Sequence, residues 1–226
     1  MSKLYMNKEE TKALTDAVIA YNKENNPIKI FNGCFDYYVE TYNLKPIYCD
    51  NWYNIINIRK DFEYRKIDKS INRMIANDKS KENEFRDFDD IKEKRRDEIN
   101  EYMETVLTFD PSNGKLKIKE IPYIIYSSID TIAKNYVENY KFYGYVYKED
   151  LKMSAIEKCL RYLSGFSGVS SNNAFSYFTT IIGRSFLETI KKEYNYSNIK
   201  AKLNTRFYGA TNEEQCEMQE TYNGNA

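Results

Sequence analysis

Histidine is absent from this chain of 226 residues. Its absence excludes histidine-based acid–base catalysis, histidine-containing catalytic triads and most catalytic zinc sites. The four cysteines have no C-x-x-C spacing, which indicates ordinary thiols in a reduced, intracellular protein. The phosphate-binding pattern G-x-x-x-x-G-K-[ST], the hydrolase pattern G-x-S-x-G and zinc-ligand spacings are also missing. We therefore expect a protein that is not an enzyme and that has no cofactor and no metal site.

A net charge is missing as well, because 34 Lys and Arg residues balance 34 Asp and Glu residues. A protein that coats nucleic acid by bulk electrostatics needs an excess of basic residues to neutralise phosphates. The N-terminus shows no secretion signal, and no apolar run approaches the length of about 18 residues that spans a bilayer. These absences predict a soluble cytoplasmic protein that binds no membrane and does not coat nucleic acid.

The charged residues are unevenly distributed along the chain. Residues 141–206 contain 11 basic and 5 acidic residues, whereas residues 209–226 contain 4 acidic residues and no basic one. A basic block followed by an acidic tail indicates a DNA-facing surface that is restrained in the free protein. The polar composition of the tail predicts disorder.

The N-terminal half predicts helices with charged faces. Residues 7–21 place apolar residues on one helical face, and Asn25-Asn26-Pro27 is expected to end that helix. Residues 33–52 are rich in aromatic residues, and helical and strand spacings compete there. Residues 59–104 contain 13 basic and 14 acidic residues, so we expect a helical pair with solvated faces. Its apolar stripes are Ile67, Ile71, Met74 and Ile75, followed by Ile91, Ile99, Tyr102, Met103 and Val106.

A β-hairpin is predicted over residues 105–121. The run Val106-Leu107-Thr108-Phe109 precedes Asp110-Pro111-Ser112-Asn113-Gly114, and Leu116-x-Ile118-x-Glu120 alternates after it. The Asn-Gly pair supplies the positive φ angle that a hairpin turn requires.

From Pro122 onward the pattern becomes strongly helical, with apolar residues at steps of three and four. It predicts helices over 122–140 and 148–163, and a third from residue 174 to 194 with Asn173 as its N-cap. Phe178, Ile182 and Phe186 repeat at four-residue steps, so we expect them in the core. The predicted fold class is therefore mainly α.

Several short motifs occur in order across these three helices. They are Lys148-Glu149-Asp150-Leu151, Ala155-Ile156-Glu157-x-Cys159-Leu160, Phe166, Asn173-Ala174-Phe175-Ser176-Tyr177-Phe178-Thr179, Phe186-Leu187 and Ile190-Lys191-Lys192-Glu193. In this order and spacing, residues 120–194 resemble the second conserved region of sigma factors. The closer similarity is to the late-transcription sigma factors of T-even-like tailed bacteriophages. Asn7-Lys8-Glu9 and its helix also fit the N-terminus of that family.

The chain departs from the family pattern in three places. Ala174 stands where the phage pattern usually has proline. Residues 32–114 look like an insertion that the short family members lack. The end of the chain, Gln219-Glu220-Thr221-Tyr222-Asn223, lacks the apolar motif with which the family contacts the polymerase flap and the sliding clamp.

The resemblance implies a mainly α fold, in which a helical sigma-region-2-like three-helix core is joined to a largely helical insertion and a small β-hairpin. Four segments are implied. They are an N-terminal helical segment (1–31), an insertion of helices and hairpin without an assigned role (32–119), a core and promoter-binding domain (120–208) and an acidic, disordered tail (209–226).

The resemblance also implies the function of a phage-type sigma factor. Such a subunit binds core RNA polymerase in the host bacterial cytoplasm, and recognises and melts a −10-like, AT-rich late promoter. Its partners are promoter DNA, the coiled coil of the largest catalytic polymerase subunit, the flap, and a phage coactivator or sliding clamp. The middle helix docks on that coiled coil, through positions that here are Asp150, Met153, Ser154, Glu157, Leu160 and Arg161.

The third helix and the loop before it would handle the promoter. Melting requires that a flipped base is held, because unstacking costs a few kcal/mol. By position, Tyr177 would form an aromatic wall, Arg184 and Glu188 would reach duplex edges or phosphates, and two lysines would contact backbone phosphate. The implied DNA-binding residues are Asn173, Phe175, Ser176, Tyr177, Thr180, Ile181, Arg184, Glu188, Lys191 and Lys192.

Two other functions remain open. The same helices could form a stand-alone DNA-binding adaptor that acts without polymerase. An acidic cluster could instead hold a divalent metal in a nuclease, although the alternating Lys and Arg residues favour a solvated helix. The cluster consists of Asp87, Asp89, Asp90 and Glu93.

Structural roles also remain open for the implied site residues. Leu160 and Tyr177 could be core residues, and Glu157 and Arg161 could be a solvated pair at i,i+4 spacing.

Overall fold

The computed structural model describes residues 6–42, 50–78, 87–138, 147–169 and 173–223. Within these ranges the secondary structure is helical, which confirms the mainly α fold class. The α-helices are α1 (Lys8–Tyr42), α2 (Asp50–Asp78), α3 (Phe88–Leu107), α4 (Tyr123–Val137), α5 (Lys148–Tyr162) and α6 (Ala174–Asn223). Short 3₁₀-helices follow α3 (η1, Pro111–Asn113) and α5 (η3, Leu163–Gly165). None of the described helices is both long and apolar enough to cross a bilayer.

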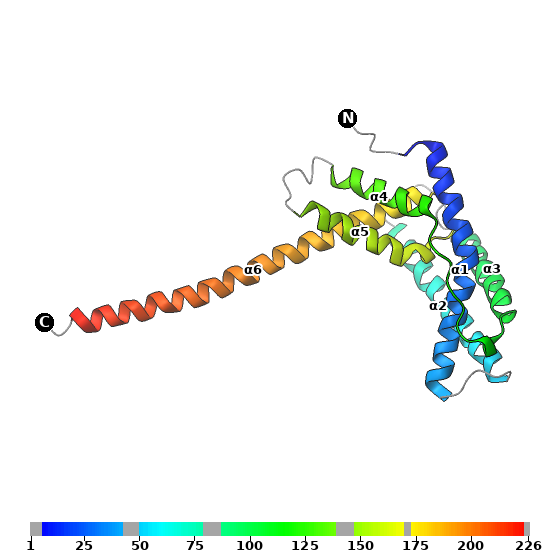
Figure 1. The fold of residues 1–226 in the computed structure, drawn as a ribbon, viewed down its shortest axis with the longest axis horizontal. Helices are drawn as coiled ribbons and strands as arrows, with labels where there is room; N and C mark the ends of the chain where they lie inside the picture. Colours follow the sequence, from blue (N-terminus) through cyan, green and yellow to red (C-terminus); the bar gives the residue numbers. More distant parts are fainter. Residues whose placement is uncertain (1–5, 43–49, 79–86, 139–146, 170–172, 224–226) are drawn as a thin grey trace.

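The helices pack around two hydrophobic cores that α1 connects (Figure 1). The first half of α1 packs with α4, α5 and the start of α6, and its second half packs with α2 and α3. Burial of each large apolar side chain stabilises the fold by about 1.5–3 kcal/mol. The first core includes Leu14, Val18, Ile125, Ile129, Leu151, Ile156, Phe178, Ile182 and Phe186, and the second includes Ile30, Phe31, Trp52, Ile56, Met103 and Val106.

Helix α1 continues through Pro27, so the prediction that Asn25-Asn26-Pro27 ends this helix is wrong. A proline in a helix interior removes a backbone hydrogen bond and costs about 3 kcal/mol. The helix continues because apolar residues on both sides of the proline are fully buried, Val18 in the first core and Phe31 in the second. The Asn25 side-chain amide also donates a 2.9 Å hydrogen bond to the Tyr21 carbonyl.

The predicted β-hairpin over 105–121 is also wrong, because the described residues contain no strand. Instead α3 extends to Leu107 and η1 follows, where the Asp110 carboxylate accepts a 2.8 Å hydrogen bond from the Ser112 N–H. Gly114 does adopt a positive φ angle, 79°, as the Asn-Gly pair predicts.

In a hairpin, the backbone after Gly114 would pair with a second strand. Here it forms hydrogen bonds with asparagine side chains of α1. Asn32 accepts from the Leu116 N–H and donates to the Leu116 carbonyl, both at 2.8 Å. Asn25 accepts from the Lys119 N–H, also at 2.8 Å. The two asparagines lie two helical turns apart on one face of α1, and together they bind backbone groups of Leu116 and Lys119, three residues apart along the segment.

Helices α2 and α3 confirm the predicted helical pair. Ile67 and Ile71 of α2 are buried, and so is Val106 of α3. Asp68 joins the two helices through Lys92 at 3.2 Å and Arg96 at 3.1 Å. Such partly exposed ion pairs contribute about 0–1 kcal/mol each, so apolar packing provides most of the attraction between these helices.

The three helices predicted after Pro122 correspond to α4, α5 and the first part of α6. The predicted end of the first one, residues 139–140, lies outside the described residues. Phe178, Ile182 and Phe186 are each 0% exposed, which confirms them as core residues.

Helix α6 has 50 residues, and a rise of 1.5 Å per residue makes it about 75 Å long. Its second half projects away from the other helices (Figure 1), and residues 191–203 are all exposed. The sequence predicts a helix end at residue 194 and disorder over 209–226, whereas the structure continues the helix to Asn223. No proline occurs after Pro122, so α6 contains no residue that lacks a backbone N–H. The segment boundaries predicted after residues 31 and 208 both fall inside continuous helices.

Candidate nucleic-acid and polymerase interface

Helices α5 and α6 pack along each other and bury one side of α6. The Ser154 hydroxyl of α5 lies 3.4 Å from both the Ser185 and the Thr189 hydroxyl of α6. Buried Cys159 of α5 contacts the backbone of Phe178, with its sulfur 4.0 Å from the carbonyl oxygen. Small side chains at these positions allow close approach of the two helices. The side of α6 that faces away from α5 and α4 therefore remains open to solvent.

The residues predicted to bind DNA divide into two groups. Three are half-buried and pack against the first core: Phe175, Tyr177 and Ile181. Seven are exposed on α6 and at its start: Asn173, Ser176, Thr180, Arg184, Glu188, Lys191 and Lys192. Of these, Glu188 lies at the edge of the open side, next to α5. The structure thus brings hydroxyl, amide and cationic groups together on one continuous helix surface.

The start of α6 is fixed by two hydrogen bonds. The Asn173 side chain accepts from the Ser176 N–H at 3.3 Å, so Asn173 caps the helix as predicted. The Ala174 N–H donates to the Thr15 hydroxyl of α1 at 3.2 Å. A proline at 174, which is usual in the phage pattern, has no N–H and would lose this bond. The hydrogen bond to Thr15 therefore requires a residue other than proline at position 174.

Tyr177 lies between the open side of α6 and the first core. Its hydroxyl donates a 2.8 Å hydrogen bond to the Tyr162 carbonyl. Its ring packs edge-on against Phe166 and Phe178, with centroid distances of 5.3 and 5.4 Å. Burial raises the pKa of Tyr177 to about 12. The ring is thus held in one orientation, and part of it belongs to the core.

The charges on this surface are mostly positive. Glu188 is the acidic residue among the predicted contacts, and it forms a 2.5 Å ion pair with Lys158 of α5. The hydrogen bond from Lys158 lowers the pKa of Glu188. Arg184, Lys191 and Lys192 are exposed on the same helix. Because Lys158 offsets the Glu188 charge, these three cations dominate the electrostatic field along this part of α6.

Sequence reasoning missed several residues of this surface. Lys158 was not predicted, since its pairing with Glu188 joins residues 30 positions apart on two helices. Leu187 is 68% exposed. It lies outside the core stripe of Phe178, Ile182 and Phe186, so the spacing of the sequence could have predicted its exposure. Tyr194 and Tyr196 are each 67% exposed and extend the aromatic character of the surface.

The residues predicted to face the polymerase lie on α5, but not all of them are open. Asp150, Met153, Glu157 and Arg161 are exposed, Met153 by 57%. Glu157 and Arg161 pair with each other at i,i+4 spacing. Ser154 faces α6, and half-buried Leu160 packs against the first core, so these two contribute little to an outer surface.

The acidic cluster considered for a metal has structural roles at the start of α3. Asp87 caps the helix by accepting a 3.0 Å hydrogen bond from the Asp90 N–H. Asp90 pairs with Lys94 at 2.7 Å. Across the part of the chain that the structure describes, no three His, Cys, Asp or Glu side chains lie close enough together to hold a metal ion.

No protein-family model, curated protein or solved structure matches this chain.

Proposed function

We propose that this protein is a phage-type sigma factor, a non-enzymatic subunit that binds core RNA polymerase and directs it to a −10-like, AT-rich late promoter. The observation that carries the proposal is the position of the sigma-like motifs. They fall on three helices that share one core, with the implied DNA contacts on the open side of α6. The host bacterial cytoplasm is the corresponding location.

The open side of α6 suits the recognition and melting of a promoter. Ser176 and Thr180 offer hydroxyls to base edges or phosphates, and Arg184 offers a planar group with several donors. Tyr177 offers an aromatic ring whose orientation the Tyr162 carbonyl fixes. A ring that is already oriented loses little conformational freedom when a flipped base stacks on it, so more of the stacking energy offsets the cost of unpairing.

The outer face of α5 suits docking on a charged protein surface. Met153 supplies an exposed, adaptable apolar centre, and Asp150, Glu157 and Arg161 surround it with both signs of charge. An apolar centre with a charged rim is typical of protein interfaces, where the rim sets orientation and association rate. We assign this face to the coiled coil of the largest polymerase subunit. Residues 219–223 lack the apolar motif with which the family contacts the flap and the sliding clamp, so a contact with the flap, a coactivator or the clamp would need another surface of this chain.

A stand-alone DNA-binding adaptor is the second candidate function. It is favoured by the projecting part of α6, where Lys191, Lys192, Lys200 and Lys202 are exposed and Glu193 is the acidic residue among positions 191–203. This cationic helix requires no polymerase to reach a phosphate backbone.

A transcription experiment separates the two candidates. Run-off transcription from AT-rich phage promoter DNA would be measured with core polymerase alone, with the wild-type protein and with an Arg184→Ala/Tyr177→Ala variant. The sigma proposal expects a promoter-specific transcript that falls by about tenfold or more in the variant. Lys134→Ala, an exposed substitution on α4, serves as the matched control and should retain full activity.

A binding experiment completes the test. The sigma proposal expects Met153→Asp to weaken capture of the protein by core polymerase while its helical circular dichroism spectrum is unchanged. Specific binding to promoter duplex without polymerase, together with no polymerase binding, would establish the adaptor and contradict the sigma proposal.

A further inference from the structure

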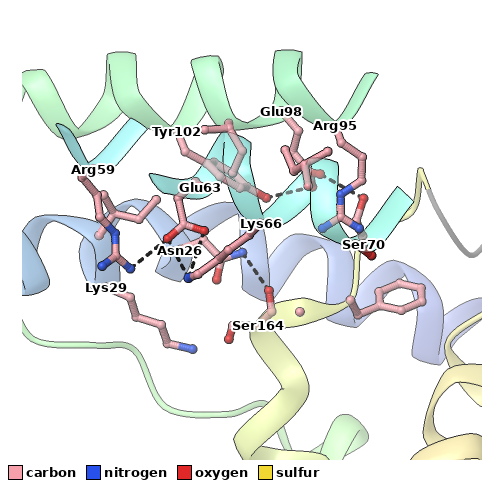
Figure 2. A pocket seen from close by; sticks show the side chains of 16 residues that line it. Asn26, Lys29, Arg59, Glu63, Lys66, Ser70, Arg95, Glu98, Tyr102 and Ser164 are labelled. Atoms are coloured by element: carbon pink, nitrogen blue, oxygen red, sulfur yellow. Dashed lines mark hydrogen bonds and ion pairs between the residues drawn. The ribbon is translucent and has the colours of Figure 1, made fainter. Parts of the chain in front are cut away.

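A pocket of about 400 Å³ lies where the two cores meet (Figure 2). Its walls come from α1, α2, α3 and the segment 164–167 that includes the end of η3. Volumes of this size are typical of small-molecule sites. Ile30, Ile67, Ile99, Tyr102 and Phe166 give it apolar and aromatic walls.

The polar groups of the pocket carry an excess of positive charge. Its lining includes four basic residues and two acidic ones, which leaves two positive charges in excess. Arg59 and Lys66 share one carboxylate, that of Glu63, at 2.9 and 3.0 Å. The other carboxylate, Glu98, accepts hydrogen bonds from the Tyr102 hydroxyl at 3.0 Å and the Ser167 hydroxyl at 2.9 Å.

Lys29 is the cation of the pocket that lacks an acidic partner among the described residues. Its nitrogen lies 5.7 Å from the centre of the Tyr21 ring, and no carboxylate pairs with it there. Burial lowers the pKa of Lys29. The Arg59 Nε–H is also buried without a hydrogen-bond partner. Figure 2 shows Lys29 of α1 in the lower part of the pocket, below Arg59 and Lys66 of α2.

Two of the pocket cations, Arg59 and Lys66, share the Glu63 carboxylate, and Lys29 has no carboxylate partner among the described residues. Partial burial of an ammonium group without a counter-ion costs desolvation free energy. A bound anion would offset the charge and reduce this cost. A doubly charged phosphate matches the excess of two positive charges. The guanidinium of Arg59 and two ammonium groups are also the donors that recognise phosphate oxygens in proteins.

We propose that this pocket binds a small molecule that carries a phosphate group, held by Lys29, Arg59 and Lys66. The volume exceeds that of the phosphate itself, so the apolar and aromatic walls have room for an organic group such as a sugar or a base. None of the lining residues is itself among the implied DNA or polymerase contacts, although Phe166 of the pocket packs against Tyr177 with ring centroids 5.3 Å apart.

The proposal is tested by calorimetric titration of the full-length protein at neutral pH, in phosphate-free buffer of constant ionic strength. The two probes are inorganic phosphate and AMP. The wild-type protein should bind at least inorganic phosphate saturably, and Lys29→Met should weaken binding by about tenfold or more. Lys23→Met is the matched control, because Lys23 lies on the same helix outside the pocket and pairs with Glu101. Tighter binding of AMP than of phosphate identifies a phosphomonoester, and equal binding identifies free phosphate.

Lys29→Met should fold well, since it replaces a partly desolvated charge by an apolar side chain of similar length. A second measurement needs no variant at all. Acylation of lysines in the wild-type protein would be mapped by mass spectrometry with and without phosphate. Phosphate should protect Lys29 and leave Lys23 unchanged. The absence of saturable binding for both probes, or equal affinity in the wild-type protein and Lys29→Met, would overturn the proposal.

Discussion

The Tyr177 hydroxyl donates a 2.8 Å hydrogen bond to the Tyr162 carbonyl, and so joins the first turn of α6 to the end of α5. Gly165 lies against the same hydroxyl, since a Cβ atom added there would be 3.1 Å from it. The ring that the sigma proposal assigns to base stacking is therefore also a structural link between two helices. Structural and DNA-binding roles of Tyr177 can be separated by removing the hydroxyl and keeping the ring.

Tyr177→Phe should lower the free energy of unfolding by about 1 kcal/mol, because it removes one hydrogen bond and retains the packing. Its effect should depend on pH. Burial raises the pKa of Tyr177 to about 12, whereas tyrosine in an unfolded chain titrates near 10. A raised pKa in the folded state means that this stability is fully present below pH 10 and is lost as the pH rises from 10 to 12.

Urea unfolding, followed by circular dichroism across this pH range, checks the prediction. The wild-type protein should lose stability more steeply above pH 10 than Tyr177→Phe. Under the sigma proposal, promoter opening by Tyr177→Phe should persist, because the stacking surface is unchanged. Parallel pH profiles for the two proteins would show that the Tyr177 hydroxyl is not buried in the way the structure indicates.

Asn32→Ala should destabilise the protein by about 1–3 kcal/mol, because it leaves the N–H and the carbonyl of Leu116 without their partners. Asn72→Ala on the exposed face of α2 is the matched control, with an expected change within about 0.5 kcal/mol. Since both substitutions place alanine in a helix, the difference between them isolates the lost hydrogen bonds. Hydrogen exchange should accelerate at the Leu116 amide in Asn32→Ala only. Unchanged exchange there would mean that the asparagine does not hold this segment.

The contrast between Asn173 and Asn32 shows which parts of the structure could be predicted from the sequence. The Asn173 cap and the core positions Phe178, Ile182 and Phe186 depend on neighbours within one helix, so spacing predicts them. Asn32 pairs with a residue 84 positions away, and nothing local distinguishes it from a solvated asparagine. The alternating residues after Gly114 therefore suggested a strand that the structure does not contain.

The same distinction applies to the candidate sites. The exposed hydroxyls and cations of α6 lie on one helix. Once the core stripe of that helix is identified, helical periodicity predicts that these residues face solvent. The pocket cations come from different helices, Lys29 from α1 and Lys66 from α2, so their approach depends on tertiary packing. Lys29 reaches the pocket because α1 continues through Pro27, although Asn25-Asn26-Pro27 favours a helix end.

Exchanging the charges of Glu157 and Arg161 distinguishes a solvated pair from a docking contact. In Glu157→Arg/Arg161→Glu the i,i+4 pair is retained in reversed order, so the free energy of unfolding should change by no more than about 0.5 kcal/mol. If this face docks on core polymerase as proposed, binding should nevertheless weaken by about tenfold, because each charge then faces the wrong partner. Affinity for the polymerase, measured by surface plasmon resonance, checks this. Wild-type affinity in the exchanged variant would show that these residues form a solvated pair and lie outside the interface.

Glu188 and Lys158 offer a sharper test of the DNA-binding surface. If Glu188 mainly offsets the charge of Lys158, Glu188→Gln should strengthen binding of the polymerase holoenzyme to promoter DNA, because Lys158 becomes free to contact a phosphate. One added phosphate contact should steepen the plot of log affinity against log salt concentration by about 0.9 on duplex DNA. If Glu188 instead accepts a hydrogen bond from a base, the same substitution should weaken binding and leave this slope unchanged.

Two further variants separate these outcomes from general changes in charge. Lys158→Gln/Glu188→Gln should cancel the gain of Glu188→Gln, since the freed ammonium group is then absent. Glu120→Gln removes an exposed carboxylate far from α6 in the sequence and should leave both affinity and salt slope unchanged. A gain that persists in the double variant would mean that the negative charge of Glu188 itself repels DNA. In that case Lys158 would contribute to the packing of α5 on α6 without reaching the promoter.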